Sequence, residues 1–167
     1  MHITGKVWKY GDDINTDVIF PGKYTYSLLD EAQMALHALE DLDQEFNKHA
    51  LQGDIIVAGK NWGCGSAREQ AVKCLKARGV GAIIAKGFSR IYYRNSLNEG
   101  LATIVSEEAV NNITAGETIS IDFSRSIIIT ESGEYAFSPY PDFLKGLVEN
   151  NGLIPYVKKT LKEQGKI

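Results

Sequence analysis

Cysteine is scarce in this sequence, and long apolar runs are absent. The 167 residues include only two cysteines, Cys64 and Cys74, which could form at most one disulfide bridge. Two thiolates alone cannot hold an iron–sulfur cluster or a structural zinc ion, so we expect no metal site within the chain. No run approaches the roughly 20 apolar residues that cross a membrane, and the first residues lack the basic and apolar regions of a signal peptide. The sequence therefore predicts a cytoplasmic protein without membrane contact.

An excess of basic residues is also missing. The chain has 18 Lys and Arg residues against 21 Asp and Glu, a formal charge of −3, and the basic residues are spread among the acidic ones. Nucleic-acid binding requires clustered Lys and Arg, so no nucleic-acid partner is expected. With 44% apolar and 23% charged residues, the composition is that of a folded globular protein. The length predicts one domain that spans residues 1–167.

Two short apolar segments, each followed by a helical pattern, dominate the middle of the chain. Residues 54–58 and 81–85 are nearly all apolar, which is typical of strands covered on both faces. Helices are predicted over residues 67–78 and 88–98, and Gly100 closes the second one. Strand, helix, strand, helix is the order of a right-handed βαβ unit. The sequence thus predicts an α/β fold.

The other elements are predicted from weaker patterns. Residues 3–9 alternate as in a strand, and the polar residues 11–17 indicate a loop. Leucines and alanines at spacings of three and four predict a helix over Leu28–Leu42. Later elements are strands near 118–123 and 126–130, a turn at Ser132–Gly133, and a helical tail of about residues 142–163 that is interrupted near Gly152 and Pro155.

A glycine-rich loop, residues 59–65, connects the first apolar strand with the predicted helix. In open α/β sheets, ligands bind at this end of the strands, where free backbone N–H groups and the positive end of the helix dipole attract anions. Ser66 and Glu69 have the spacing of a capping box, with Ser66 as the N-cap. Arg68 adds a forked donor that matches a carboxylate. The alternative is a structural turn, in which Ser66 only caps the helix and Arg68 faces water.

Known nucleotide and calcium motifs do not fit this chain. A P-loop needs Lys immediately before its final Ser or Thr, but a glycine precedes Ser66. The dinucleotide fingerprint needs a third glycine where Arg68 stands, and Lys86 follows the next strand in place of a ribose-binding acid. Residues 13–17 begin like a calcium loop but are followed by Val18, where glycine is required. All three ligand classes are therefore disfavoured.

Two cysteines and two arginines remain as candidates for chemistry. Cys64, close to a helix N-terminus, could be a reactive thiolate, but no histidine lies near it in the sequence, so a packing role is preferred. Cys74, within the predicted helix, is expected in the core. Arg90 and Arg94 are four residues apart, so they share one helical face. They could together neutralise a dianion, or else remain solvated.

Three segments, in this order, resemble the small subunits of the two-subunit 3-isopropylmalate dehydratases and homoaconitases. The segments are residues 11–22 (GDDINTDVIFPG), 61–71 (NWGCGSAREQA) and 88–101 (FSRIYYRNSLNEGL). These small subunits are the swivelling domain of the aconitase superfamily, and the resemblance covers most of the chain. It implies a single three-layer β/β/α domain with a mixed, largely parallel sheet and a βαβ unit.

The resemblance implies a hydro-lyase that is active only with a large subunit, in a heterodimer or a heterotetramer. That partner would carry a [4Fe–4S] cluster on three cysteines, with one iron open to substrate, and this chain would hold no cofactor. The reaction removes water from a small di- or tricarboxylate and adds it back with the hydroxyl on the neighbouring carbon. For 2-isopropylmalate and 3-isopropylmalate, this is a step of leucine biosynthesis.

The resemblance also assigns roles to site residues. Ser66 matches the catalytic serine, which as an alkoxide takes the proton from the substrate carbon, and Arg68 matches the arginine that binds a substrate carboxylate. A serine anion needs strong stabilisation, which helix N–H groups and Arg68 would supply. Ala67 replaces a second serine of many relatives, so one supporting hydrogen bond is absent. We expect further substrate contacts from Gly65, Ala67, Thr25 and Tyr26, with Asp17, Arg90, Arg94 and Asn95 in support.

Tyr26 bears on the choice of substrate. In this family that choice is associated with the loop after Pro21-Gly22, and homoaconitases tend to place an arginine at the position of Tyr26, because their substrates carry a third carboxylate. A tyrosine ring suits an isopropyl group better, since a buried unpaired charge is costly. Isopropylmalate is therefore the expected substrate. Homocitrate, a small methyl-substituted malate, or a loop that accepts both kinds of substrate are the alternatives.

Two other classes of function stay open from the sequence alone. A non-catalytic module could use the same glycine loop to hold an anion, and small dicarboxylates would then bind the isolated chain. A stand-alone thiol enzyme would depend on Cys64, so alkylation of Cys64 would abolish its activity.

Overall fold

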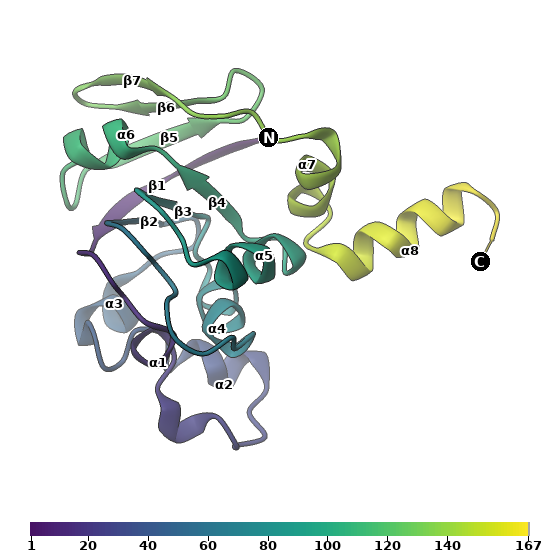
Figure 1. The fold of residues 1–167 in the computed structure, drawn as a ribbon, viewed down its shortest axis with the longest axis horizontal. Helices are drawn as coiled ribbons and strands as arrows, with labels where there is room; N and C mark the ends of the chain where they lie inside the picture. Colours follow the sequence, from purple (N-terminus) through teal and green to yellow (C-terminus); the bar gives the residue numbers. More distant parts are fainter. Residues whose placement is uncertain (167) are drawn as a thin grey trace.

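The computed structural model describes residues 1–166, in which seven strands form one mixed sheet (Figure 1). The strands lie in the order β4-β3-β2-β1-β5-β6-β7. The pairs β1–β2, β2–β3 and β3–β4 are parallel, and the other three pairs are antiparallel. The strands are β1 (His2–Lys9), β2 (Ile55–Ala58), β3 (Ala82–Ala85), β4 (Ala102–Val105), β5 (Thr118–Asp122), β6 (Ile127–Thr130) and β7 (Gly133–Ala136).

Most helices lie on one side of the parallel strands, and the last helix, α8, projects away from the sheet (Figure 1). The helices are α1 (Thr16–Ile19), α2 (Glu31–Ala35), α3 (Gln44–His49), α4 (Gln70–Arg78), α5 (Arg90–Asn98), α6 (Glu107–Asn112), α7 (Asp142–Glu149) and α8 (Leu153–Glu163), with one 3-10 turn, η1 (Gly22–Tyr24). None of these helices is long and apolar enough to span a bilayer, as far as residues 1–166 go.

Strand β1 belongs to both halves of the sheet. Residues 2–6 pair with β5 in the antiparallel half, and residues 7–9 pair with β2 in the parallel half. The sheet therefore folds over along β1 into two layers, and the helices form the third (Figure 1). The predicted three-layer β/β/α arrangement with a mixed sheet and a βαβ unit is confirmed. Four of the seven strands, β1 to β4, make up the parallel part.

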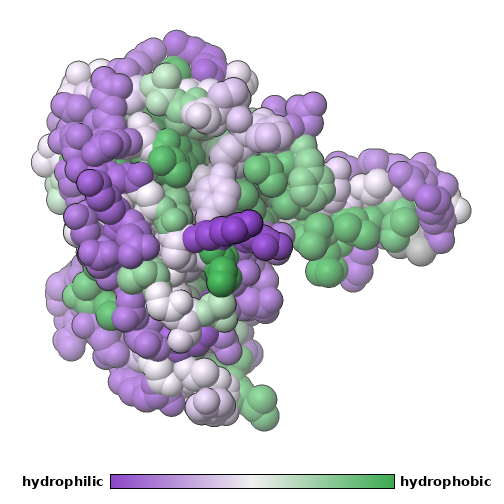
Figure 2. Space-filling model, viewed as in Figure 1, coloured by the Kyte–Doolittle hydropathy of each residue, from purple (hydrophilic) through white to green (hydrophobic). Residues whose placement is uncertain are grey.

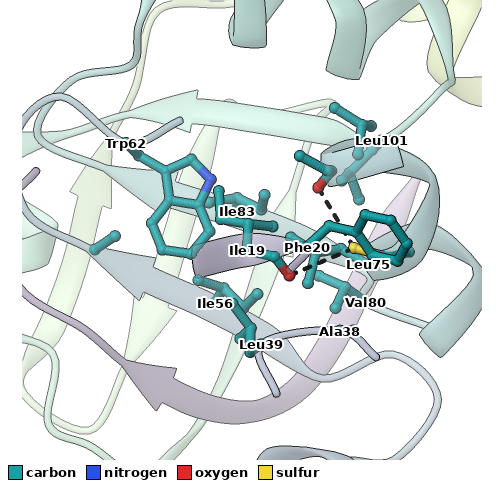
Figure 3. Close-up of a cluster of buried hydrophobic side chains, with 14 of the residues drawn as sticks. Ile19, Phe20, Ala38, Leu39, Ile56, Trp62, Leu75, Val80, Ile83 and Leu101 are labelled. Atoms are coloured by element: carbon teal, nitrogen blue, oxygen red, sulfur yellow. Dashed lines mark hydrogen bonds between the residues drawn. The ribbon is translucent and has the colours of Figure 1, made fainter. Parts of the chain in front are cut away.

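Alternate residues of the parallel strands face two different cores. Ile55 and Val57 of β2 pack in the core between the two strand layers, whereas Ile56 and Ala58 pack in the core between the sheet and the helices. All four are fully buried, so β2 is covered on both faces, as its apolar run predicts. Figure 3 shows the helix-side core, in which Ile56 lies beside Leu39.

Helix α4 begins later than predicted, which changes the role of Ser66. The helix starts at Gln70, and Glu69 precedes it without a side-chain cap. The capping box predicted for Ser66 and Glu69 is therefore wrong. The physical reason is a tertiary contact: the Ser66 carbonyl accepts a hydrogen bond from Thr16 Oγ1 at 2.9 Å, whereas a helix N-cap would direct this carbonyl to the N–H of Gln70.

The helix predicted over residues 28–42 is mostly wrong. Only Glu31–Ala35 is helical, with Asp30 as its N-cap, and residues 36–42 form turns. Leu39 has a φ of 55°, which stops a helix. This residue is fully buried, and its N–H donates to the Ile19 carbonyl at 2.9 Å. Packing against α1 therefore outweighs the helical spacing of the leucines.

Five short elements are absent from the sequence-based prediction: α1, α3, β4, α6 and β7. Each has four to six residues, which is too short for a clear hydrophobic period. Helix α1 begins within the segment 11–17 that we expected to be a loop, and Asn15 caps it by accepting from the Asp17 N–H at 2.6 Å. This short helix places Thr16 against the glycine loop and Asp17 beside Arg68.

The remaining predictions are confirmed within one or two residues. Helix α5 starts after Ser89, which caps it, and Gly100 follows its end with a φ of +76°. The tail consists of α7 and α8, separated at Gly152 as predicted. Pro155 does not interrupt the tail, because it is the third residue of α8, where a backbone N–H has no helical acceptor to lose.

A buried carboxylate, Asp54, ties β1 to the turn before β2. It accepts hydrogen bonds from the backbone N–H of Lys6 at 3.2 Å, the indole of Trp8 at 2.9 Å and the backbone N–H of Leu51 at 2.9 Å. Only 4% of the residue is exposed. Because three donors converge on one anion, Asp54 fixes where the fold-over strand β1 meets the parallel sheet.

We expect Asp54→Ala to destabilise the fold by roughly 2–4 kcal/mol, because the variant leaves buried donors without an acceptor. Urea unfolding followed by circular dichroism measures this free energy. The exposed Asp41 provides the control, since Asp41→Ala should change the stability by less than about 0.5 kcal/mol. Equal effects of the two substitutions would contradict the structural role of Asp54.

Candidate functional site

The three segments that carry the sequence resemblance lie side by side in the fold. Asn15 and Cys64 form an isolated parallel bridge, and Trp62 forms another with Phe88. The Ser89 N–H also donates to the Trp62 carbonyl at 2.8 Å. Residues 61–66, which follow β2, are thus held between the start of α1 and the start of α5. This is the carboxyl end of the parallel strands, where α/β sheets place their ligand sites.

Thr16 fixes the backbone of residues 61–66, which we call the serine loop. Its N–H donates to the Cys64 carbonyl at 2.8 Å, and its hydroxyl donates to the Ser66 carbonyl. Thr16 is only 2% exposed, whereas Ser66 is exposed. The Ser66 side chain is therefore on the surface, on a backbone that a buried residue anchors. The sequence reasoning missed Thr16, although it stands within the first of the three segments.

Gly63 allows helix α5 to approach the serine loop closely. A Cβ atom at this position would lie 2.1 Å from the ring of Tyr92, and the φ of Gly63 is +75°. The Ser89 hydroxyl, which caps α5, also donates to the Gly63 carbonyl at 2.6 Å. The start of α5 thus packs on the loop at Gly63. Any other residue at this position would displace Tyr92.

A cleft of about 200 Å³ opens in front of Ser66. Its walls come from the serine loop and from α5, with Thr16 at the base. The cleft contains two arginines, an amide and one half-exposed isoleucine, so it offers donors for an anion beside an apolar side chain. The residues that line it are Thr16, Gly63, Gly65, Ser66, Ala67, Arg68, Ser89, Arg90, Ile91, Tyr92 and Asn95.

Arg68 is engaged by its own chain. Its Nη1 donates to Thr25 Oγ1 at 2.7 Å, and its Nη2 donates to the Phe20 carbonyl at 3.0 Å and lies 2.7 Å from Asp17 Oδ1. The side chain is only 10% exposed, and among residues 1–166 its buried Nε has no acceptor. Arg68 therefore holds the loop after α1 in place and retains one donor without a partner.

Arg68 also separates the cleft from a second hollow of about 460 Å³. Phe20, Tyr24, Leu29 and Met34 give this hollow an apolar wall beneath the loop that Arg68 holds. Ala67 and Arg68 line both hollows.

The backbone N–H groups around Ser66 are available for an anion. Those of Gly65, Ser66 and Ala67 donate to no backbone carbonyl within the described chain. Successive free N–H groups next to a left-handed glycine form an anion-binding concavity. The helix N–H groups that we expected beside Ser66 begin only at Gln70, so the loop itself replaces the helix terminus as the positive element.

The structure brings together most of the predicted site residues but not all. Gly65, Ser66, Ala67, Arg68, Arg90 and Asn95 line the cleft, and Asp17 and Thr25 join them through Arg68. Arg94 shares a surface groove with Arg90 but lies outside the cleft. Tyr26 is 98% exposed and lines neither hollow, so its role in substrate choice stays a prediction.

The two cysteines differ in their surroundings. Cys74 is fully buried in the helix-side core, its Sγ lies 3.7 Å from the Ile19 and Ala71 carbonyls (Figure 3), and burial raises the pKa of its thiol well above the ordinary range. The predicted core role of Cys74 is confirmed. Cys64 is half-buried and does not line the cleft. Over residues 1–166, no three His, Cys, Asp or Glu side chains are grouped to hold a metal ion.

Comparison with known families identifies the family to which this fold belongs. Residues 14–109 match the model of the aconitase C-terminal domain, and the match includes residues 14–22 of the first segment, the whole of the other two segments, β4 and the start of α6. The chain belongs to the aconitase C-terminal domain family.

Individual relatives within this family are more specific. The chain is 46% identical over 160 residues to the 3-isopropylmalate dehydratase small subunit of Clostridium beijerinckii, which covers 95% of this chain and 99% of the relative. It is 47% identical over 163 residues to the protein of the same name from Clostridium acetobutylicum, with 96% and 99% coverage.

A solved structure agrees with these relatives. The crystal structure of 3-isopropylmalate dehydratase (LeuD) from Methanocaldococcus jannaschii superposes with a TM-score of 0.92 at 38% identity, over 99% of each chain. The holo-form of aconitase X from Thermococcus kodakaraensis, at a TM-score of 0.50 and 14% identity, shares the fold alone.

Gly63 and Gly65 provide a matched test of the site's packing. We expect Gly63→Ala to cost about 3 kcal/mol or more, since its Cβ collides with Tyr92 as well as straining the backbone. Gly65→Ala should cost only about 1–2 kcal/mol, because its nearest neighbour would be Thr16 Oγ1 at 3.5 Å and only the backbone is strained. Urea unfolding measures both, and equal losses would show that the contact with Tyr92 does not shape the loop.

Proposed function

We propose that this chain is the small subunit of a 3-isopropylmalate dehydratase, a hydro-lyase that interconverts 2-isopropylmalate and 3-isopropylmalate together with a large subunit. The observation that carries the proposal is the exposed Ser66 in an open cleft that also contains Arg68 and Arg90. The names of the relatives support the substrate and do not favour the homoaconitase alternative.

Ser66 is the proposed base that takes the proton from the substrate carbon. A serine hydroxyl loses its proton only where the resulting anion is stabilised. The free N–H groups of residues 65–67 and the guanidinium of Arg90 supply positive charge at the cleft. The Thr16 hydroxyl contributes indirectly, because its bond to the Ser66 carbonyl keeps the backbone from continuing into helix α4.

Arg68 is the proposed ligand of a substrate carboxylate. Within residues 1–166 its Nε has no acceptor, and its Nη2 is paired with Asp17, whose side chain is 59% exposed. A substrate carboxylate could replace such a solvated partner and add a bond to Nε, because a forked donor prefers two oxygens of one carboxylate. Asp17 and Thr25 then keep the buried guanidinium of Arg68 paired until substrate binds.

Arg90 and Asn95 are the proposed donors for the second carboxylate. Both lie on α5 and line the cleft opposite the serine loop, and Ile91 between them offers an apolar surface that is half exposed. Arg94 faces the neighbouring groove, where it adds positive charge without reaching the cleft. Tyr26 would contact substrate only after the loop that follows Pro21 folds toward the cleft.

The partner completes the site. A cleft of about 200 Å³ is smaller than the roughly 300 Å³ at which ligand pockets usually begin, so one wall must come from elsewhere. We infer that the large subunit supplies this wall and carries the [4Fe–4S] cluster, which as a Lewis acid would bind the substrate hydroxyl. The two cysteines of this chain do not fit a cluster, since Cys74 is enclosed in the core.

Replacement of Ser66 tests the proposal. In the complex with a cluster-bearing large subunit, Ser66→Ala should lower kcat for hydration of the dehydrated intermediate by about 10²–10⁴-fold, because in this direction Ser66 returns the proton to carbon and a positioned acid–base group usually contributes that much. The Michaelis constant should change little, because Ser66 does not hold a carboxylate. Steady-state kinetics and size-exclusion chromatography of the complex measure activity and assembly separately.

The exposed Ser138, outside the cleft, is the matched control, and Ser138→Ala should retain full activity. Full turnover by an intact Ser66→Ala complex would reject Ser66 as the base. If the wild-type complex turned over a tricarboxylate but not isopropylmalate, the substrate assignment would be rejected. The role of Ser66 as the base would not be affected by that result.

A further inference from the structure

The turn that reaches Arg68 lies on the surface and has little packing of its own. It consists of η1 and Thr25, and the loop that carries it lies at the end of the molecule beside α2 (Figure 1). Figure 2 shows hydrophilic and hydrophobic side chains intermixed at this end of the molecule, and η1 contains no buried residue. Surface turns of this kind are mobile unless other contacts hold them, so polar contacts must fix where the turn lies.

One carboxylate, Glu40, in the turns between α2 and α3, contacts this turn. Its Oε1 lies 2.6 Å from Lys23 Nζ and accepts a hydrogen bond from the Tyr24 hydroxyl at 3.4 Å. Its Oε2 lies 2.5 Å from His37 Nδ1, and the His37 ring stacks on the Tyr24 ring with the centroids 3.9 Å apart. The Lys23 ammonium lies 4.9 Å from the centre of the same Tyr24 ring. We call these four side chains the Glu40 clasp.

The contacts of the clasp reinforce one another. The hydrogen bond with Lys23 is the largest cause that lowers the pKa of Glu40, so this carboxylate is ionised at neutral pH. Lys23 is 55% exposed, and an exposed ion pair by itself contributes little. Glu40 is only 29% exposed, however, and it binds a hydroxyl and an imidazole as well. The clasp is therefore a network in which one partly buried anion holds the turn.

The clasp and Arg68 hold the same turn. Thr25 follows Lys23 and Tyr24 directly in the chain, and its Oγ1 accepts from Arg68 Nη1 at 2.7 Å. The Thr25 N–H donates to the Gly22 carbonyl at 3.1 Å, so the hydroxyl is carried by the hydrogen-bonded turn. The position of the Thr25 hydroxyl thus follows from the position of Lys23 and Tyr24. Loss of the clasp would free the turn and weaken the contact of Thr25 with Arg68.

We propose that Glu40 is a positioning residue for substrate binding, because through the clasp it keeps Thr25 on Arg68. The guanidinium is then oriented before a substrate carboxylate arrives, and less side-chain freedom is lost when the carboxylate binds. This inference rests on the function proposed above, in which Arg68 binds that carboxylate. Glu40 lines neither the cleft nor the second hollow, so it touches no reacting group and acts on affinity alone.

Glu40→Gln tests this role, because glutamine keeps the size of the side chain and removes its charge. In the complex with the large subunit, the variant should raise KM for isopropylmalate about tenfold and change kcat less than about twofold. A merely structural role would lower the amount of folded complex without changing KM. The matched control is Glu45→Gln, which should keep the wild-type KM. Glu45 also contacts a lysine and a histidine, Lys48 and His49, but it is 60% exposed and lies on α3.

A double variant tests whether Glu40 acts through Thr25. Thr25→Val removes the hydroxyl that Arg68 contacts and should raise KM by itself. Glu40→Gln/Thr25→Val should then have the same KM as Thr25→Val alone, because the clasp has no hydroxyl left to position. Independent effects, which multiply in the double variant, would overturn the proposal.

Hydrogen–deuterium exchange of the full chain tests the clasp without substrate. In Glu40→Gln, the amides of residues 22–29 should exchange about tenfold faster than in wild type, whereas those of β2 should keep their rates. Glu45→Gln should match wild type in both regions. Unchanged exchange or an unchanged KM in Glu40→Gln would overturn the role of Glu40. A wild-type complex that does not turn over isopropylmalate would instead reject the proposed function, and faster exchange in Glu40→Gln would still confirm that Glu40 holds the turn.

Discussion

The site depends on hydrogen bonds that hold residues 61–66 between two distant segments. Thr16 fixes the loop from one side through the Ser66 carbonyl, and Ser89 fixes it from the other through the Gly63 carbonyl. Both anchors act on the backbone, so the structure of the loop does not depend on the Ser66 hydroxyl. If Ser66 takes up and releases a proton as proposed, its side chain can change protonation while its backbone stays in place.

The sequence predicts the scaffold better than it predicts the site. Residues 54–58 and 81–85 form buried strands because a purely local property, an uninterrupted apolar run, decides their structure. The position of Ser66 outside helix α4 is different, since it is set by Thr16, fifty residues earlier in the chain. A capping box is a local pattern, and a tertiary hydrogen bond outweighed it. The same holds for Leu39, whose buried contact with α1 breaks a helical spacing.

Arg68 shows what only the fold can reveal about a candidate ligand. In the sequence it is an arginine beside a glycine loop, free to bind an anion. In the structure its partners Asp17, Phe20 and Thr25 come from α1 and the segment that follows it, more than forty residues away. A guanidinium that is nine-tenths buried must be paired, so the proposed binding of a carboxylate at Arg68 would be coupled to the position of this segment. The loop that the resemblance connects with substrate choice is thus physically linked to the arginine.

The cleft and helix α8 lie at different ends of α5. The cleft is lined by Arg90, Ile91 and Asn95 of α5, whereas α8 begins beside the other end of α5, where Gly152 meets the turn at Gly100. Along an α-helix of nine residues these ends are about 13 Å apart. A large subunit that closes the cleft would therefore not need the surface of α8.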